Sequence, residues 1–209
     1  MSEPPVIERD TTRRELLRGG VVGMAASAGV ALAATCDPPE ALAAPVMGDV
    51  GAVLVSLLRV EKVLVLAYER ALASGTLAPQ ASKLASAFLA HERAHFHALS
   101  VHLTDLGATV AVAPTTTAAF ESELRHLRVR RSLASLRTQR EHLRFLTDLE
   151  TLSARHYRFA IARLSAAKQL RTAAEIMANE AQHATVLREF LSPGNVKRAV
   201  PTGFVAGHS

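Results

Sequence analysis

Tryptophan is absent from the chain, tyrosine occurs twice and cysteine occurs once among 209 residues. The single cysteine, Cys36, excludes an internal disulfide framework. Aromatic residues make up 4% of the sequence and hydrophobic residues 49%, so a core of aliphatic side chains is expected. Alternating β-branched residues are almost absent outside residues 50–65 and 108–113. These features favour one all-helical domain with a sizeable core and argue against a sheet protein.

Positive charge is unevenly distributed along the chain, although the formal net charge is only +5. Residues 125–144 contain seven arginines against one glutamate. Such a run is typical of a solvated helix face, and contact with an anionic surface or polymer is the alternative. No aromatic side chains alternate with these arginines to stack on bases, so no nucleic-acid partner is expected.

Residues 1–43 have the pattern of an export signal. An arginine pair at residues 13–14 precedes a mildly apolar stretch over residues 21–34, which is too short to span a bilayer. This order resembles a twin-arginine signal peptide. The resemblance implies that the twin-arginine machinery exports the folded protein across the cytoplasmic membrane, to the periplasm, the envelope or the medium. Cleavage after Ala-Leu-Ala at residues 41–43 is expected, and lipid attachment at Cys36 is the alternative.

Four long stretches with helical periodicity follow the signal, at about residues 49–74, 82–106, 120–164 and 171–191. The third stretch is too long for one average helix, so a break is expected near residues 131–135. Short turns join the first two and the last two helices, and a longer connection lies between these pairs. This pattern predicts a four-helix bundle with one crossover connection. The expected signal, linker, bundle and extended tail occupy residues 1–43, 44–49, 50–192 and 193–209.

One pattern of polar residues occurs twice, with an offset of 88 or 89 residues. In each copy a tyrosine follows a glutamate by seven residues, and a Glu-x-x-His comes later. The copies are Glu61, Tyr68, Glu92 and His95, and then Glu150, Tyr157, Glu180 and His183. Residues three and seven positions apart share one face of a helix, so each copy can direct its polar side chains into the bundle.

Four carboxylates and two imidazoles in one bundle form the ligand set of a dinuclear iron or manganese centre. Divalent iron and manganese favour oxygen and imidazole ligands, and bridging carboxylates also neutralise their charge. The predicted metal ligands are therefore Glu61, Glu92, His95, Glu150, Glu180 and His183. Tyr68 and Tyr157 lie two turns from the ligand glutamates of their helices. They are expected either to hydrogen-bond a ligand carboxylate across the bundle or to fill the core.

Two further motifs compete with this interpretation. A third Glu-x-x-His, Glu123 to His126, has no paired glutamate and is expected at the surface. His91, Glu92 and His95 also match the His-Glu-x-x-His signature of zinc proteases. That signature leaves the second copy of the repeat unexplained, and no sheet is predicted that could align a peptide substrate.

Longer runs of sequence resemble a known family. Residues 89–99 read Leu-Ala-His-Glu-Arg-Ala-His-Phe-His-Ala-Leu, residues 150–157 Glu-Thr-Leu-Ser-Ala-Arg-His-Tyr, residues 178–184 Ala-Asn-Glu-Ala-Gln-His-Ala, and residues 200–205 Val-Pro-Thr-Gly-Phe-Val. These runs resemble the second, third and fourth helices and the tail of exported bacterial ferritin-like domain proteins. The resemblance extends over residues 50–205. It implies a ferritin-like four-helix bundle with a di-iron site at the six matching ligand positions.

The resemblance implies two iron ions as cofactor, with manganese as the alternative, and either iron oxidation or redox chemistry with oxygen or peroxide. Fold resemblance alone does not establish an activity. The competing hypothesis is a non-enzymatic binding or stress-protection module of the cell envelope. In that case the glutamates and histidines would be satisfied by one another or by Arg93, Arg155 and Arg158. A homo-oligomer is compatible with either reading.

Overall fold

The computed structural model describes residues 47–108, 110 and 116–203, which all belong to one compact unit, Leu42–Ser209. The predicted signal at residues 1–43, with Cys36, therefore lies outside the described residues, as do residues 204–209 of the predicted tail. The second half of the predicted linker, residues 47–49, already belongs to the first helix.

The described part of the chain is all-helical and contains no strand, which confirms the predicted fold class. Its α-helices are α2 (Met47–Ala73), α3 (Pro79–Asp105), α4 (Thr117–His126), α5 (Gln139–Ile161), α6 (Ala167–Leu191) and α7 (Val196–Ala199). A 3-10 turn covers Leu133–Ser135. None of the described helices is both long and apolar enough to cross a membrane.

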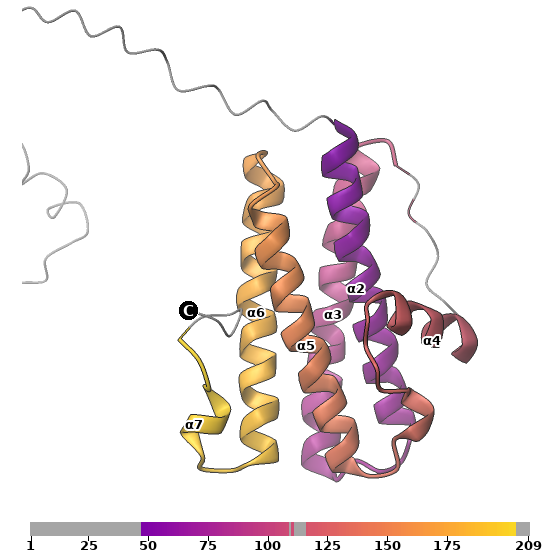
Figure 1. Cartoon of the computed structure of the whole chain (residues 1–209), viewed down its shortest axis with the longest axis vertical. Coiled ribbons are helices and arrows are strands. Elements are labelled where there is room, and N and C mark those ends of the chain that lie inside the picture. Colours follow the sequence, from indigo (N-terminus) through magenta and orange to yellow (C-terminus); the bar gives the residue numbers. More distant parts are fainter. Residues whose placement is uncertain (1–46, 109, 111–115, 204–209) are drawn as a thin grey trace, which may run out of the picture. The chain divides into compact units, whose positions relative to one another are not determined.

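The four long helices form two antiparallel hairpins (Figure 1). α2 pairs with α3, and α5 pairs with α6. The hairpins meet where α2 packs on α5 and α3 packs on α6. The longer connection lies between α3 and α5 and contains α4, which packs against α2. The predicted bundle with one crossover is thus the observed arrangement.

Local chemistry explains several helix ends. The Thr138 hydroxyl accepts from the backbone N–H of Glu141, whose carboxylate accepts from the Thr138 N–H, so a reciprocal capping box starts α5. The Thr116 hydroxyl caps α4 in the simpler way. Gly75 and Gly107 follow α2 and α3 with φ of +67° and +74°, a conformation that a residue without a Cβ adopts readily.

Three boundaries differ from the prediction. α3 begins at Pro79 rather than near residue 82, because proline is well suited to the first helical position. α6 begins at Ala167 rather than near residue 171, and its N-cap makes no side-chain hydrogen bond. The connection from α4 to α5 covers residues 127–138, more than the predicted break, because Glu121 Oε1 accepts hydrogen bonds from Ser132 Oγ and the Leu133 N–H.

The tail also departs from the predicted extended form. After Gly194, residues Val196–Ala199 form a single helical turn, because the Asn195 side chain accepts a hydrogen bond from the Arg198 N–H at 3.1 Å. Ala199 is buried against the bundle. The residues after α7 have no regular structure up to residue 203.

The bundle core consists of two apolar clusters. One contains Tyr68 with Leu64, Leu89, Leu149 and further aliphatic residues. The other contains Tyr157 with Leu58, Leu99, Ile176 and their neighbours. Every long helix has a single buried glutamate. Residues of one cluster come before this glutamate in the helix, and residues of the other cluster come after it. The fold therefore encloses a polar layer between two aliphatic clusters.

Candidate metal centre

Each long helix contributes one glutamate to the polar layer. Glu61 comes from α2, Glu92 from α3, Glu150 from α5 and Glu180 from α6, and the exposed fraction of each is 0%. Helical periodicity explains this placement, because each glutamate occupies the inward face that its aliphatic neighbours share. The structure thus brings together the four carboxylates that the sequence repeat singles out.

The donor atoms of the layer form two overlapping groups. The first consists of Glu61, Glu92, Glu180 and His95, and the second of Glu92, Glu150, Glu180 and His183. Within each group, one candidate ligand atom from each residue lies within 4.8 Å of all the others. Glu92 and Glu180 belong to both groups, so their carboxylates lie where the two groups overlap. The sequence predicts the six residues but not which two carboxylates are shared.

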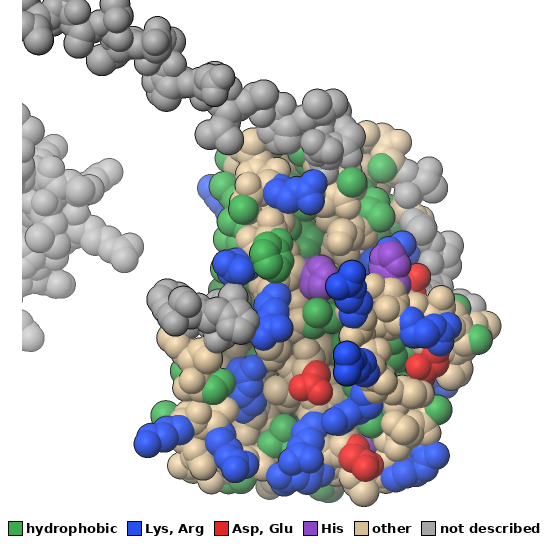
Figure 2. Space-filling view, viewed as in Figure 1, with side chains coloured by type: hydrophobic (Ala, Val, Ile, Leu, Met, Phe, Trp, Pro, Cys, Tyr) green, Lys and Arg blue, Asp and Glu red, His purple; other side chains and the backbone are tan. Residues whose placement is uncertain are grey.

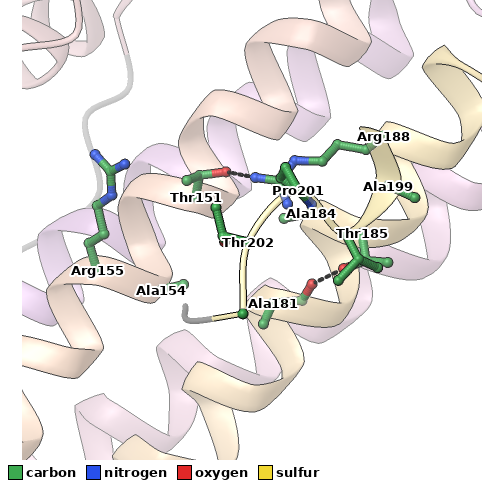
Figure 3. Close-up of a pocket in the computed structure, with 12 residues that line it drawn as sticks. Thr151, Ala154, Arg155, Ala181, Ala184, Thr185, Arg188, Ala199, Pro201 and Thr202 are labelled. Atoms are coloured by element: carbon green, nitrogen blue, oxygen red, sulfur yellow. Dashed lines mark hydrogen bonds between the residues drawn. The ribbon is translucent and has the colours of Figure 1, made fainter. Parts of the chain in front are cut away.

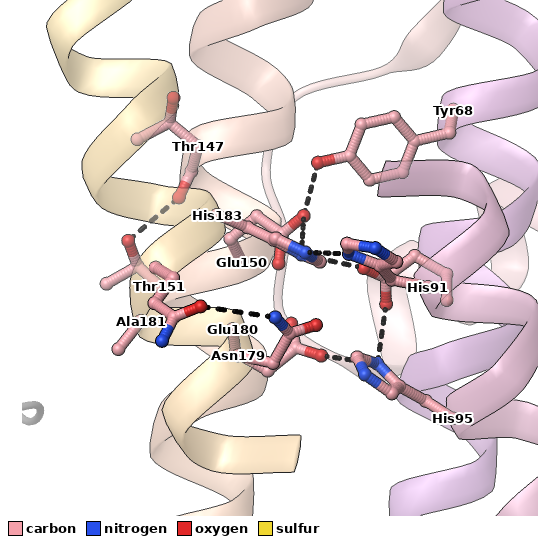
Figure 4. A network of polar contacts seen from close by, with 12 residues as sticks. Tyr68, His91, His95, Thr147, Glu150, Thr151, Asn179, Glu180, Ala181 and His183 are labelled. Carbon is pink, nitrogen blue, oxygen red and sulfur yellow. Dashed lines mark hydrogen bonds and ion pairs between the residues drawn. The ribbon is translucent and has the colours of Figure 1, made fainter. Parts of the chain in front are cut away.

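His95 lies close to three carboxylates, and Figure 4 shows its contact with Glu180. Its Nδ1 atom lies 3.0 Å from Glu180 Oε1 and 3.4 Å from Glu92 Oε2. The same atom lies 3.6 Å from Glu61 Oε2. One imidazole nitrogen therefore points into the space that the carboxylates of three different helices surround.

His183 is held on both sides of its ring. Its Nδ1 atom lies 2.9 Å from Glu92 Oε1 and 3.4 Å from Glu150 Oε1. Its other nitrogen, Nε2, lies 2.9 Å from Nδ1 of His91, and its ring stacks on Phe88 with centroids 4.0 Å apart. A His183 Nε2–H that donates to His91 leaves the Nδ1 lone pair directed at the carboxylates, as a metal ligand requires. His91 itself is exposed, so it connects the layer to the surface.

Both tyrosines are fully buried and donate to a carboxylate across the bundle. The Tyr157 hydroxyl on α5 donates to Glu61 Oε1 on α2 at 2.6 Å. The Tyr68 hydroxyl on α2 donates to Glu150 Oε1 on α5. The two hydrogen bonds run in opposite directions between the same two helices. Each tyrosine thereby fixes the repeat glutamate of the opposite helix.

The remaining polar atoms of the layer suit a cation better than they suit one another. Five carboxylate oxygens have no hydrogen bond of good geometry: Glu61 Oε2, Glu92 Oε1, Glu150 Oε2 and both oxygens of Glu180. His183 Nδ1 is in the same state although carboxylate oxygens are near. These atoms converge on common space instead of pairing. Four buried carboxylates would otherwise cost on the order of several kcal/mol each, and bound cations would offset that cost by balancing their charge.

Electrostatics of the metal-free layer favour the protonated carboxyl groups. Burial, followed by the charge of Glu180, raises the pKa of Glu92 from 4.5 to about 7. Burial and the same charge raise the pKa of Glu61. Burial, followed by the charge of Glu92, raises the pKa of Glu150 well above 4.5. Burial, followed by the charge of Glu150, raises the pKa of Glu180 well above 4.5. Without cations, the layer therefore retains protons that ordinary glutamates release.

The pKa of His95 moves in the same direction for a different reason. Burial lowers this pKa, but the contacts with Glu180, Glu61 and Glu92 outweigh burial and raise it from 6.5 to about 12. The metal-free layer thus uses a proton on His95 in place of a cation. A metal ion at this position would displace that proton.

The competing motifs lie where metal binding is not supported. Glu123 pairs with Arg59 at 3.0 Å on the surface, and His126 Nε2 lies 2.5 Å from Nη1 of the same arginine. In this third Glu-x-x-His, His126 is exposed as expected, whereas Glu123 is half-buried. In the zinc-protease signature His91 and His95 would bind one ion, but the nearest described partner of the His91 ring is His183, and His91 is in neither donor group.

The three arginines that could have neutralised the layer are occupied elsewhere. Arg93 pairs with Glu69 at 2.8 Å, at the surface. Arg158 lies over the ring of Phe159, 4.7 Å from its centroid. Arg155 lines a surface cavity between α5 and α6. In the described part of the chain, His95, His183 and the two tyrosines contact these glutamates, and none of the three arginines forms an ion pair with them.

Comparison with known proteins agrees with this architecture. A family model described as a ferritin-like domain matches residues 49–193, and the chain belongs to this family. Its structure is similar to the crystal structure of a conserved hypothetical protein, rv2844, from Mycobacterium tuberculosis. The TM-score is 0.59 and the identity 18%, over 71% of this chain and 94% of that chain. This likeness concerns the fold alone. The chain matches no curated protein.

Proposed function

We propose that the polar layer binds two iron ions, or two manganese ions, and that the protein oxidises ferrous iron or carries out redox chemistry with oxygen or peroxide. The observation that carries the proposal is the pair of overlapping donor groups that share Glu92 and Glu180. Membership of the ferritin-like domain family supports it. The buried cluster of glutamates and histidines is compatible with bound metal ions. We propose that these ions are iron or manganese and that there are two of them.

The donor groups assign a role to each side chain. Glu61 and His95 would hold one ion, and Glu150 and His183 the other. Glu92 and Glu180 would bridge them, which lets the four carboxylates neutralise two divalent charges. The carboxylate oxygens without hydrogen bonds are the atoms available for these contacts.

Bound ferrous ions would supply the electrons for reduction of oxygen or peroxide. The chain itself orients and insulates the layer. Tyr68 and Tyr157 each hold one carboxylate through the hydroxyl proton, and the aliphatic clusters on either side exclude water. His91 fixes the His183 ring and lies at the surface, where protons can be exchanged with solvent.

Metal content of the purified chain tests the proposal. We expect about two iron or manganese ions per chain after growth with both metals, the number that such a ligand set holds. Glu180→Gln removes a carboxylate shared by both groups and should abolish binding of both ions while circular dichroism shows unchanged helicity. Glu175→Gln is the matched control, because Glu175 is exposed on the same helix.

The outcomes separate the alternatives. Two ions in wild type and Glu175→Gln, but none in Glu180→Gln, would support the centre, and oxygen and peroxide consumption would then be measured. One zinc ion per chain would favour the His91–His95 signature. No metal in wild type, or equal metal in all three proteins, would refute the dinuclear centre and favour a binding module without metal.

We also propose that residues 1–43 direct export through the twin-arginine route. The arginine pair followed by a mildly apolar stretch supports this. Arg13→Lys combined with Arg14→Lys should retain the chain in the cytoplasm, measured by fractionation and immunoblotting. Arg18→Lys, which keeps the arginine pair, should leave export unchanged. Equal export of both variants would show that the pair is not the signal.

A further inference from the structure

A cavity of about 330 Å³ away from the metal layer is lined by five cationic side chains. They belong to three helices: Arg140 and Arg144 lie near the start of α5, Arg188 near the end of α6, and Lys197 and Arg198 in α7. Its other lining residues carry no charge. Figure 2 shows lysine and arginine side chains gathered on this part of the surface, over α7 and the beginning of α5.

The folded-back tail creates this convergence. Gly194 has a φ of +71°, and its N–H donates to Glu189 Oε1 at 2.6 Å, which turns the chain at the end of α6. The Asn195 cap and the buried Ala199 then hold α7 against the bundle. As a result, Lys197 and Arg198 face a cavity that they share with residues more than 50 positions earlier in the sequence.

The described carboxylates balance the charges in this cavity only in part: Asp148 interacts electrostatically with Arg144 and Arg188. Arg140, Arg144, Lys197 and Arg198 are exposed, and none forms an ion pair within 4.0 Å in the described part of the chain. Asp148 on α5 is a neighbouring carboxylate, and it too forms no ion pair at that distance. Like charges brought together repel, and the positive end of the α5 dipole adds to the repulsion at Arg140.

Arg188 extends the cationic surface into a second cavity. Its Nη2 donates to Thr151 Oγ1 at 2.7 Å, which fixes the guanidinium between α5 and α6 (Figure 3). Arg188 and Pro201 line both cavities. The second cavity measures about 400 Å³ and has Arg155 at its edge and alanines on its walls. The two cavities together offer an anion-binding part and an adjoining less charged part.

We propose that this basic cavity binds a phosphate group, carried by a free phosphate, a small phosphorylated molecule or a lipid headgroup. Guanidinium groups bind phosphate through parallel hydrogen bonds, and several cations around one cavity match a multiply charged anion better than a single carboxylate. The phosphate would neutralise cations that the fold gathers without close ion pairs in the described part of the chain. This site is separate from the metal layer and does not depend on the proposed metal chemistry.

Titration calorimetry with inorganic phosphate tests the site on the full chain. Wild type should bind, and combining Lys197→Gln with Arg198→Gln should raise Kd roughly tenfold, equivalent to about 1.4 kcal/mol. Combining Arg140→Gln with Arg144→Gln, on the opposite wall of the cavity, should raise Kd by a similar factor. Lys83→Gln with Arg171→Gln is the matched control, because it removes the same two charges from exposed positions outside the cavity. Glu180→Gln should bind phosphate like wild type, which separates this site from anion binding at the metals.

Vesicle co-sedimentation distinguishes the sources of the phosphate group. Binding of inorganic phosphate without binding to phosphatidylglycerol vesicles would indicate a soluble ligand. Retention on phosphatidylglycerol but not on phosphatidylcholine vesicles, lost in the Lys197/Arg198 double variant, would indicate a lipid headgroup. Absence of both kinds of binding, or an equal loss in the cavity variants and the control, would overturn the proposal.

Discussion

At the residue scale, the two histidines of the repeat are not equivalent. His183 has a partner on its outer nitrogen, His91, and a stacked neighbour, Phe88. His95 has three carboxylates around Nδ1, and within the described residues no hydrogen bond holds its other nitrogen. A histidine whose outer nitrogen is held keeps its ligand atom oriented before metal arrives. We therefore expect the ion near His183 to bind more tightly than the ion near His95.

His91→Ala should weaken one of two bound ions by roughly tenfold to a hundredfold, the usual cost of removing such an outer partner. Stability should change by less than about 0.5 kcal/mol, because the side chain is exposed. His97→Ala, an exposed histidine on the same helix, is the control and should bind like wild type. Manganese titration followed by electron paramagnetic resonance measures both sites. Equal weakening of the two ions would contradict a role specific to His183.

Residue identity alone leaves the partners of the tyrosines open. The spacing of seven places Tyr68 on the face of Glu61, and Tyr157 on the face of Glu150. In the structure each hydroxyl instead reaches the glutamate of the opposite helix, because two turns along one helix span roughly 10 Å. The antiparallel packing of α2 on α5 closes that distance.

At the element scale, α5 is the helix whose beginning is best determined by its own sequence. The Thr138-x-x-Glu141 capping box is present in the printed sequence and could have placed the start at Gln139. α3 and α6 have alanine at the N-cap and no side-chain cap hydrogen bond. The start of α3 is marked by Pro79 alone and that of α6 by neither a proline nor a cap, which explains why the predicted starts lie three or four residues late.

Thr138→Ala should destabilise the protein by about 0.5–2 kcal/mol, because it removes the hydroxyl that accepts the Glu141 N–H. Urea unfolding followed by circular dichroism measures the loss. Thr104→Ala is the control: Thr104 lies on the exposed face near the end of α3, where alanine is the better helix former. A loss as large in Thr104→Ala as in Thr138→Ala would show that the cap makes no specific contribution.

At the scale of the whole molecule, the polar layer lowers the stability of the metal-free fold. Metal-free folding must bury four carboxylates between two aliphatic clusters, and protons on the glutamates and on His95 compensate in part. Groups of this kind have higher pKa values in the folded state than in the unfolded state. Their contribution to stability is present below the unfolded pKa and is lost as pH rises through the folded pKa.

The stabilisation by metal should therefore grow with pH. For Glu92 the window runs from 4.5 to about 7, and for His95 from 6.5 to about 12. The difference in Tm between manganese-loaded and metal-free protein should be small at about pH 5.5 and larger at about pH 8, where metal no longer displaces as many protons. Comparing loaded with free protein cancels the titration of histidines outside the layer. A difference in Tm that is equal at both pH values would contradict protons as the substitutes for cations.

The sequence by itself determines the four long helices, though not all of their ends, and the six candidate ligands. Helical periodicity, glycines at helix ends and the repeated Glu and Glu-x-x-His spacing act within one segment, so they can be read without the fold. Membership of the ferritin-like domain family agrees with that reading.

Only the tertiary structure decides which side chains share space. Packing of the hairpins makes Glu92 and Glu180 common to both donor groups, pairs each tyrosine with the opposite helix, and places His91 behind His183. The return of the tail gathers the cations of the basic cavity from three helices. These relations involve distances between segments far apart in the chain, and such distances are set by how the helices pack and not by spacing along any one of them.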